Sequence, residues 1–225
     1  MQIQLKESLS QSGLRSELRP TPPDMLPDAL LTDALSPQAF VSPILVSERL
    51  VLRAPDMADT NAISHLANNM NVASKVSRMP HPYTIKDAEN FVARVASGAM
   101  GKCVYAVTIG ETREFIGACS LEAHETGRGL EIGYWLGEPY WNRGFATEAA
   151  QTLIDFGFRH FDVDFVDARV RVMNIASRRV IQKCGFQFQG TGMAGSLALG
   201  GMVAVEWFRL DRKTWGSLRS WGGAR

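Results

Sequence analysis

Hydrophobic and polar positions recur with two different periods along this chain, and the periods predict where strands and helices lie. The run Leu130–Leu136 is apolar except at Glu131 and Gly133, and Gly137-Glu138-Pro139 ends it, so a strand is predicted there. From Ala146 to Phe161 the apolar residues recur at helical spacing, which predicts a helix directly after the strand. The remaining elements are expected to pack around this strand-turn-helix unit.

The same periodicities predict the other elements. Strands are expected at Ser47–Arg53, Cys103–Ile109, Phe115–Glu122, Phe165–Val172, Phe186–Gln189 and Val203–Leu210. Helices are expected from Asp56, as N-cap, to about Asn69, from Ile85 to Ser97 with Thr84 and Asp87 as caps, and from Ile175 to Cys184 before a left-handed Gly185. Gly190–Gly201 is expected to be an irregular, glycine-rich loop.

This order of elements predicts one mixed, three-layer α/β domain over residues 44–217. Residues 1–43 contain six prolines, at 20, 22, 23, 27, 37 and 43, and are expected to form a flexible extension. A short docking helix at Asp28–Leu35 is the alternative there, although so short a helix is marginal alone. Residues 218–225 are expected to be a C-terminal tail.

Composition narrows the class of protein. With 225 residues, 45% hydrophobic and 21% charged, the chain is long enough to bury one core. A net charge of +1 gives no reason to expect a nucleic-acid partner. No apolar run reaches about 18 residues and no secretory leader is recognisable, so no membrane association and a cytoplasmic location are expected.

The cysteines, Cys103, Cys119 and Cys184, lie far apart without metal-binding spacing. They are interpreted as reduced core residues, and no metal is expected. Cys119 as an acyl-accepting nucleophile is the alternative, but its apolar strand favours a buried structural thiol.

The turn Tyr140–Thr147 has small residues, Gly144 and Ala146, where the central helix begins. The first amides of a helix have no internal partner and carry roughly +0.5 of a charge. A diphosphate is therefore expected against these amides, with Arg143 adding positive charge. This stretch contains neither of the two common nucleotide-binding signatures, Gly-x-x-x-x-Gly-Lys-Ser/Thr and Gly-x-Gly-x-x-Gly. Ordinary packing of a strand-turn-helix is the alternative.

Two motifs resemble the GNAT superfamily of acyl-CoA-dependent N-acyltransferases. The residues Glu131–Leu136 followed by Tyr140–Glu148 resemble motif A of the RimJ/RimL-like branch, although Trp141 stands where most of the superfamily has Gln or Arg. The stretch Asn174–Phe186 is similar to the family's Asn-x-x-Ser-x-x-x-x-x-Lys-x-Gly-Phe. The resemblance implies the GNAT-like fold, a mixed, mostly antiparallel twisted sheet flanked by helices.

The resemblance also implies acetyl-CoA as acyl donor, bound between the central strand and its successor without a metal. Asn174 is equally well placed to cap the following helix, and the two roles are compatible. The residues expected to bind the cofactor are Tyr134, Trp135, Leu136, Asn142, Arg143, Gly144, Phe145, Ala146, Thr147, Asn174 and Arg179.

The resemblance implies Ser177 as proton donor to the leaving thiolate. Glu131 on the central strand is the preferred candidate for the general base, acting directly or through water. A structural pairing of Glu131 with an arginine of the first strand is equally plausible. Some family members have an acidic base shortly after Gly-Phe, whereas here Glu206 is the first acidic residue after Phe186. That departure puts a base at this site in doubt.

We therefore expect transfer of an acetyl group from acetyl-CoA to a primary amine, by direct attack without a covalent enzyme intermediate. A protein or peptide N-terminal α-amine is the preferred acceptor, because its pKa of about 7.7 to 8.0 makes deprotonation easier than for lysine. The alternatives are a small-molecule amine acetyltransferase and a noncatalytic acyl-CoA sensor or interaction module. The Ser77–Tyr83 and Gly190–Gly201 segments are expected to shape the acceptor side, and a homodimer is one assembly open to the chain.

Overall fold

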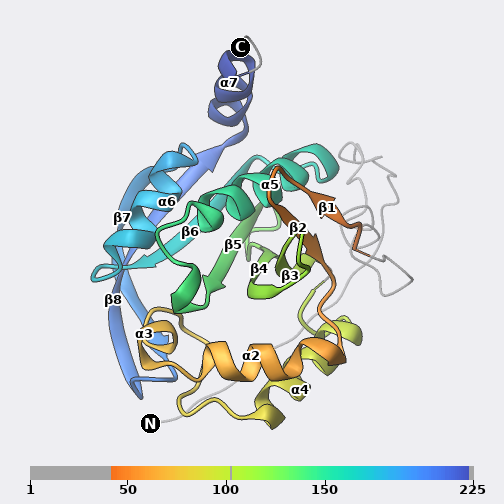
Figure 1. Cartoon of the computed structure of the whole chain (residues 1–225). Coiled ribbons are helices and arrows are strands. Elements are labelled where there is room, and N and C mark those ends of the chain that lie inside the picture. The colour runs from red at the N-terminus through yellow and green to blue at the C-terminus, as the bar shows by residue number, and fades with distance from the viewer. Residues whose placement is uncertain (1–41, 102, 223–225) are drawn as a thin grey trace, which may run out of the picture. The chain divides into compact units, whose positions relative to one another are not determined.

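The computed structural model describes residues 42–101 and 103–222, which belong to one compact unit (Figure 1). The extension predicted for residues 1–43, with its alternative helix Asp28–Leu35, lies almost wholly outside the described residues. No helix in the described ranges is both long and apolar enough to cross a membrane.

One sheet of eight strands forms the centre of the fold, in the order β1-β2-β3-β4-β5-β6-β8-β7. Neighbouring strands run antiparallel except for the β5–β6 pair, which is parallel. The predicted mixed, mostly antiparallel sheet is confirmed. The strands are β1 (Leu45–Val46), β2 (Leu50–Arg53), β3 (Cys103–Ile109), β4 (Phe115–Ala123), β5 (Gly129–Leu136), β6 (Phe165–Arg171), β7 (Gln187–Ser196) and β8 (Gly201–Asp211).

Helices cover both faces of the sheet (Figure 1). The ends of α4 and α6 follow from local chemistry, because Thr84 and Asp87 form a capping box and Gly185 adopts a φ of 93° just past α6. The helical elements are η1 (Met57–Asp59), α2 (Thr60–Ala67), α3 (Met70–Ala73), α4 (Ile85–Ala96), η2 (Glu138–Tyr140), α5 (Phe145–His160), α6 (Ile175–Lys183) and α7 (Arg212–Gly222). Helix α7 continues past residue 217, where the domain was predicted to end.

Two hydrophobic cores lie on opposite faces of the sheet. On the α5–α6 face, Leu153 and Ile181 pack with strand residues such as Ile132. On the α2–α4 face, Ile63 and Val92 pack in a second core that also holds Trp135 at its edge. Residues that alternate along β5 therefore belong to different faces.

Strands β5 and β6 part company near their C-terminal ends. Their parallel pairing runs from Gly129–Phe165 to Ile132–Ala168 and then stops. Strand β5 nevertheless continues to pair with β4 as far as Leu136, and β6 continues to pair with β8 as far as Arg171. The two strands therefore splay. Beyond Ile132, the edge of β5 that faces β6 has no strand partner and presents its backbone to the opening.

Two predicted elements at the start of the domain are wrong in detail. The strand expected at Ser47–Arg53 begins only at Leu50, because the Ser47 amide and hydroxyl both donate to the Leu50 carbonyl and close a tight turn between β2 and the preceding strand β1. The helix expected from its N-cap Asp56 to about Asn69 consists of η1 and α2 and ends at Ala67. Asn69 then starts the separate helix α3 by accepting a hydrogen bond from the Asn71 amide.

The predicted loop Gly190–Gly201 is also wrong. Residues up to Ser196 belong to β7, which pairs with β8 from Gln187–Arg209 to Ser196–Gly201, with a bulge between Phe188 and Gly190. Glycines weaken a strand but do not prevent backbone pairing. The indole of Trp207 covers Gly192, where an added Cβ would lie 3.0 Å from the Trp207 Nε1 atom.

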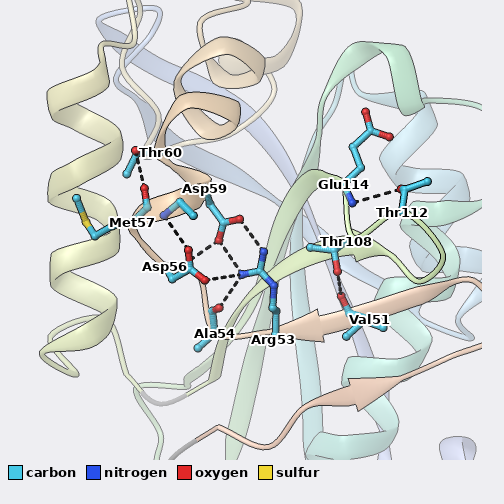
Figure 2. A network of polar contacts seen from close by, with 11 residues as sticks. Val51, Arg53, Ala54, Asp56, Met57, Asp59, Thr60, Thr108, Thr112 and Glu114 are labelled. Atoms are coloured by element: carbon cyan, nitrogen blue, oxygen red, sulfur yellow. Dashed lines mark hydrogen bonds and ion pairs between the residues drawn. The ribbon is translucent and has the colours of Figure 1, made fainter.

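A buried carboxylate fastens η1 to β2 (Figure 2). Asp59 is 5% exposed, and its two oxygens accept hydrogen bonds of 2.8 and 2.7 Å from the Arg53 guanidinium. Asp59 also accepts from the Asp56 amide at 2.9 Å, and Asp56 in turn caps the Ala58 amide. The hydrogen bond to Asp59 raises the pKa of Arg53 above its ordinary value. The α2–α4 layer is thereby tied to the sheet at its first turn.

Candidate functional site

A large cavity, of about 1570 Å³, follows the opening between β5 and β6. Its walls include residues from both faces of the sheet, among them Ile63 of α2, Trp135 of β5 and Ala146 of α5. Pockets for single small ligands are typically about 300 to 1,000 Å³. The cavity is therefore large enough for two substrates that meet at the opening.

The N-terminus of α5 forms one wall of this cavity. Gly144 is the N-cap residue with a φ of 83°, and it provides no side-chain cap for the helix amides. Asn142, two residues earlier, also has a positive φ, of 59°, a conformation that asparagine tolerates better than most residues. The first amides of α5 consequently lack a capping side chain and can receive an anion.

The turn before α5 is held by a network that the sequence did not reveal. Glu148, in the first turn of α5, accepts hydrogen bonds from the Arg49 amide at 2.7 Å, the Arg49 Nε at 2.8 Å and the Ser47 hydroxyl at 2.8 Å. Arg49 also donates to the Arg143 carbonyl at 3.0 Å. Burial opposes ionisation of Glu148, but these hydrogen bonds together hold its pKa below the ordinary value. The β1–β2 turn therefore fixes the conformation of residues 143–148.

Ser177 is joined to Tyr134 across the opening. The Tyr134 hydroxyl lies 2.8 Å from the Ser177 Oγ, and Asn174 caps α6 by accepting from the Ser177 amide at 3.2 Å. Burial raises the pKa of Tyr134 well above its ordinary value, so the phenol keeps its proton at neutral pH. The pair can therefore pass or position a proton at the mouth of the cavity.

Glu131 faces the other side of the sheet and is paired with Arg169 of β6. The Arg169 Nε and Nη2 donate to the two carboxylate oxygens at 2.7 and 2.8 Å. The alternative pairing with an arginine of the first strand is wrong, since Arg49 binds Glu148 and Arg53 binds Asp59. Glu131 lines the cavity, so its carboxylate is within the site although it is charge-compensated.

The cavity holds a second carboxylate beside the first. Glu122 of β4 lies opposite Glu131 in the β4–β5 register and is paired with Arg78. That hydrogen-bonded pair raises the pKa of Arg78 above its ordinary value. Both carboxylates of the α2–α4 wall are thus neutralised by arginines that also line the cavity.

The two segments expected to shape the acceptor side border the same cavity and contact each other. The Leu197 amide, at the tip of the β7–β8 hairpin, donates to the Ser77 carbonyl at 3.0 Å. Ser196, which precedes it, is 4% exposed and its hydroxyl is buried without a partner among the described residues. The hairpin tip therefore closes one end of the cavity against the Ser77–Tyr83 segment.

The three cysteines are buried. Burial raises the pKa of the Cys119 thiol well above its ordinary range and that of Cys184 to about 12. Such thiols are poor nucleophiles at neutral pH. Within the described ranges, no group of three or more His, Cys, Asp or Glu residues is arranged to hold a metal ion.

The structure brings the predicted site residues together with one exception. Glu131, Ser177 and every predicted cofactor residue except Arg143 line the cavity. The Arg143 guanidinium is exposed and lies 4.8 Å from the centre of the Phe145 ring. Sequence reasoning missed Arg49 and Glu148, whose pairing spans 99 positions, and the side-chain role of Tyr134. For the Arg49–Glu148 pair, the sequence offered one signal, which was the acidic Glu148 in the first turn of the predicted central helix.

A known protein family and a curated protein each match this chain over more than half of its length. A family model described as an acetyltransferase (GNAT) domain matches residues 49–187. An uncharacterized N-acetyltransferase, p20 of Bacillus licheniformis, is 29% identical over 175 residues, which cover 75% of this chain and 96% of the relative. The family match runs from β2 to the first residue of β7 and so includes the whole opening between β5 and β6.

Solved structures share the fold at lower identity. RimL, a ribosomal L7/L12 alpha-N-protein acetyltransferase solved with coenzyme A, matches with a TM-score of 0.64 and 21% identity, over 75% of this chain and 98% of its own. A spermidine N-acetyltransferase from Vibrio cholerae, solved with CoA and spermine, matches with a TM-score of 0.63 and 20% identity, over 75% and 99%. Proteins with this fold therefore acetylate quite different amines.

Proposed function

The chain belongs to the GNAT acetyltransferase family, and we propose that it transfers the acetyl group of acetyl-CoA to the N-terminal α-amine of a protein or peptide. The observation that carries the proposal is the parting of β5 from β6 after Ile132 and Ala168. This opening lies between the uncapped start of α5, the Ser177 hydroxyl and the Glu131 carboxylate, all of which line one cavity.

Acetyl-CoA fits the donor side of this cavity. The unpaired end of β5 offers backbone amides and carbonyls to the pantetheine arm, and residues Gly144–Thr147 offer helix amides to the diphosphate. Arg179 and Lys183, exposed on α6, also line the cavity and add positive charge beside it. When bound, acetyl-CoA supplies the thioester, the activated acyl group that the acceptor amine attacks.

Proton transfer is assigned to groups on opposite faces of the sheet. Ser177, hydrogen-bonded to a phenol that stays protonated, is suited to donate a proton to the leaving thiolate. Glu131 is suited to accept the proton of the attacking amine, directly or through water. Both of its carboxylate oxygens already accept hydrogen bonds from Arg169, so an acceptor amine that gives up its proton readily suits this site.

An α-amine meets that requirement better than a lysine side chain or a polyamine. Its pKa of about 7.7 to 8.0, against about 10.4 for lysine, lowers the cost of deprotonation by roughly 3 kcal/mol. The two carboxylates of the α2–α4 wall, Glu122 and Glu131, are already paired with arginines, which leaves little negative charge to attract a polycation. RimL, with the same fold, is named for α-N-protein acetylation. Direct attack of the amine on the thioester is favoured over an acyl-cysteine intermediate, because the three cysteines are buried.

The test is the initial rate of CoA release with acetyl-CoA and single acceptors: peptides with free or blocked α-amines, and spermidine as the small-amine alternative. Transfer is expected only to free α-amines, with sequential kinetics. Ser177→Ala is expected to lower kcat by roughly 10²-fold. Release that depends on spermidine but not on peptides would favour the small-amine enzyme. Cofactor binding with no turnover in broad acceptor panels would favour an acyl-CoA sensor.

A further inference from the structure

Arg171 is the last residue of β6, and its side chain belongs to the α2–α4 face of the sheet. Side chains alternate along a strand, and Val170 is buried in the core on the α5–α6 face. Arg171 is therefore in the same row as Arg169, which pairs with Glu131 on the α2–α4 face. The side chain lines the cavity beyond that ion pair.

The guanidinium of Arg171 has no partner among the residues that the structure describes. Within residues 42–101 and 103–222, no hydrogen bond or ion pair joins its side chain to another residue, and its Nε atom is buried. A buried donor without a partner costs free energy, more so when it belongs to a charged group. An arginine kept in such a position is explained most directly by a ligand that supplies the missing acceptor.

The charges around Arg171 indicate what that ligand carries. The two carboxylates that line the cavity, Glu122 and Glu131, are each bound by an arginine that lines it too. Arg171 is therefore an additional positive charge on the α2–α4 wall. It lies on the face of the sheet opposite the start of α5, where the donor diphosphate is assigned, so the acceptor is the nearer source of an anion.

We propose that Arg171 binds a carboxylate of the acceptor, so that the preferred substrate is a primary amine with a carboxylate a few bonds away. A guanidinium matches a carboxylate with two parallel hydrogen bonds and distinguishes it from an amide of the same shape. This inference rests on the proposed function, since it names the substrate class of the same site. It predicts peptides with Asp or Glu next to the acetylated residue.

A peptide fits this wall better than a free amino acid, which would also offer a carboxylate. In the register of the sheet, Arg171 pairs with Val205 and Val205 with Gly192. Ser196, whose buried hydroxyl also lacks a partner among the described residues, follows Gly192 by four positions on β7. At about 3.3 Å per strand residue, these two unpartnered groups are roughly 13 Å apart along the strand direction. A ligand that reaches both is as long as an extended peptide of several residues.

The test compares kcat/KM for peptides that differ only at the second residue, Asp, Asn or Lys, in the full-length protein and three variants. The wild-type protein is expected to prefer Asp over Asn by about tenfold, and Asn over Lys. Arg171→Gln is expected to bring the Asp-to-Asn ratio close to one without changing the KM for acetyl-CoA. Arg171→Lys should keep part of the preference, and Arg159→Gln, an exposed arginine at the end of α5, should keep all of it.

The outcomes separate this inference from the proposed function. If the wild-type protein acetylates all three peptides at equal rates, or if Arg171→Gln leaves the Asp-to-Asn ratio unchanged, the role of Arg171 is overturned and peptide acetylation still stands. A rise in the KM for acetyl-CoA in Arg171→Gln with every peptide would assign Arg171 to the donor and overturn the inference. If no peptide reacts, the proposed function fails. An Arg171-dependent preference for alanine over alaninamide would then support carboxylate recognition with a free amino acid as its source.

Discussion

Replacing Gly144 with valine tests whether the start of α5 binds the CoA diphosphate. Gly144 is the N-cap residue, with a φ of 83°, and an added Cβ would lie 3.2 Å from the Arg49 Nη2 atom. A β-branched residue at such a φ costs about 1 to 3 kcal/mol of stability. The neighbouring atom is the end of a flexible side chain, so we expect the protein to fold with a lower unfolding midpoint.

The effect on the cofactor should be larger than the effect on stability. A hydrogen bond to a charged group contributes about 1.5 to 3 kcal/mol, and the valine side chain should displace the diphosphate from one or two amides. Because 1.4 kcal/mol corresponds to a factor of ten, loss of one such hydrogen bond should raise the Kd for CoA by roughly 10-fold to 150-fold, and loss of two should raise it further. Isothermal titration of folded protein with CoA measures this directly.

Gly127→Val is the matched control for backbone strain. Gly127 has a φ of 71° in an exposed turn, and nothing lies within 4 Å of an added Cβ. It should lose comparable stability and keep its CoA affinity. Arg143→Ala should weaken binding by at most about fivefold and less at high salt, because that side chain is exposed. If Gly144→Val binds CoA within threefold of wild type, or Gly127→Val loses as much affinity, the diphosphate site is elsewhere.

Three further predictions concern the groups that support the site. Tyr134→Phe should lower kcat by about tenfold with the KM for acetyl-CoA nearly unchanged, because Ser177 loses its 2.8 Å partner; an unchanged kcat in steady-state assays would remove Tyr134 from the mechanism. Asp59→Asn should cost about 2 to 4 kcal/mol in urea unfolding, since it leaves Arg53 without its bidentate carboxylate, and a loss below 0.5 kcal/mol would contradict this. The pKa of Glu148 is lowered in the folded state, so its stabilising effect is present above the ordinary value of 4.5 and is lost as pH falls through the folded value; the wild-type advantage over Glu148→Gln should therefore disappear in acid, and a constant difference between pH 7 and pH 3 would refute the assignment.

The elements that could be predicted from sequence are those determined by local patterns. The helix α5 and the strands β3 and β5 follow from hydrophobic periodicity over fewer than twenty residues, and the ends of α4 follow from the spacing of Thr84 and Asp87. The part of β7 from Gly190 onward was predicted as a loop, because this glycine-rich part is stabilised by backbone pairing with β8. Backbone pairing leaves little trace in side-chain periodicity.

The cavity-lining residues of the candidate site were predicted from motifs, whereas their side-chain partners were not. Glu131 is hydrogen-bonded to Arg169, 38 positions away in the sequence, and Glu148 is hydrogen-bonded to Arg49, 99 positions away. Such pairs depend on which strands become neighbours and in what register, and a single sequence contains little information on either. Arg171 could not be predicted as a site residue for the same reason, since only the folded sheet shows that its side chain has no partner among the described residues.

The central claim is best tested by finding which atom becomes acetylated. The protein is incubated with acetyl-CoA and a pool of peptides that contain both free α-amines and lysines, and the products are sequenced by tandem mass spectrometry. We predict acetylation of N-terminal α-amines, unmodified lysine side chains, and loss of the products with Gly144→Val. Acetylation confined to lysine side chains, or products that persist in Gly144→Val, would contradict the account.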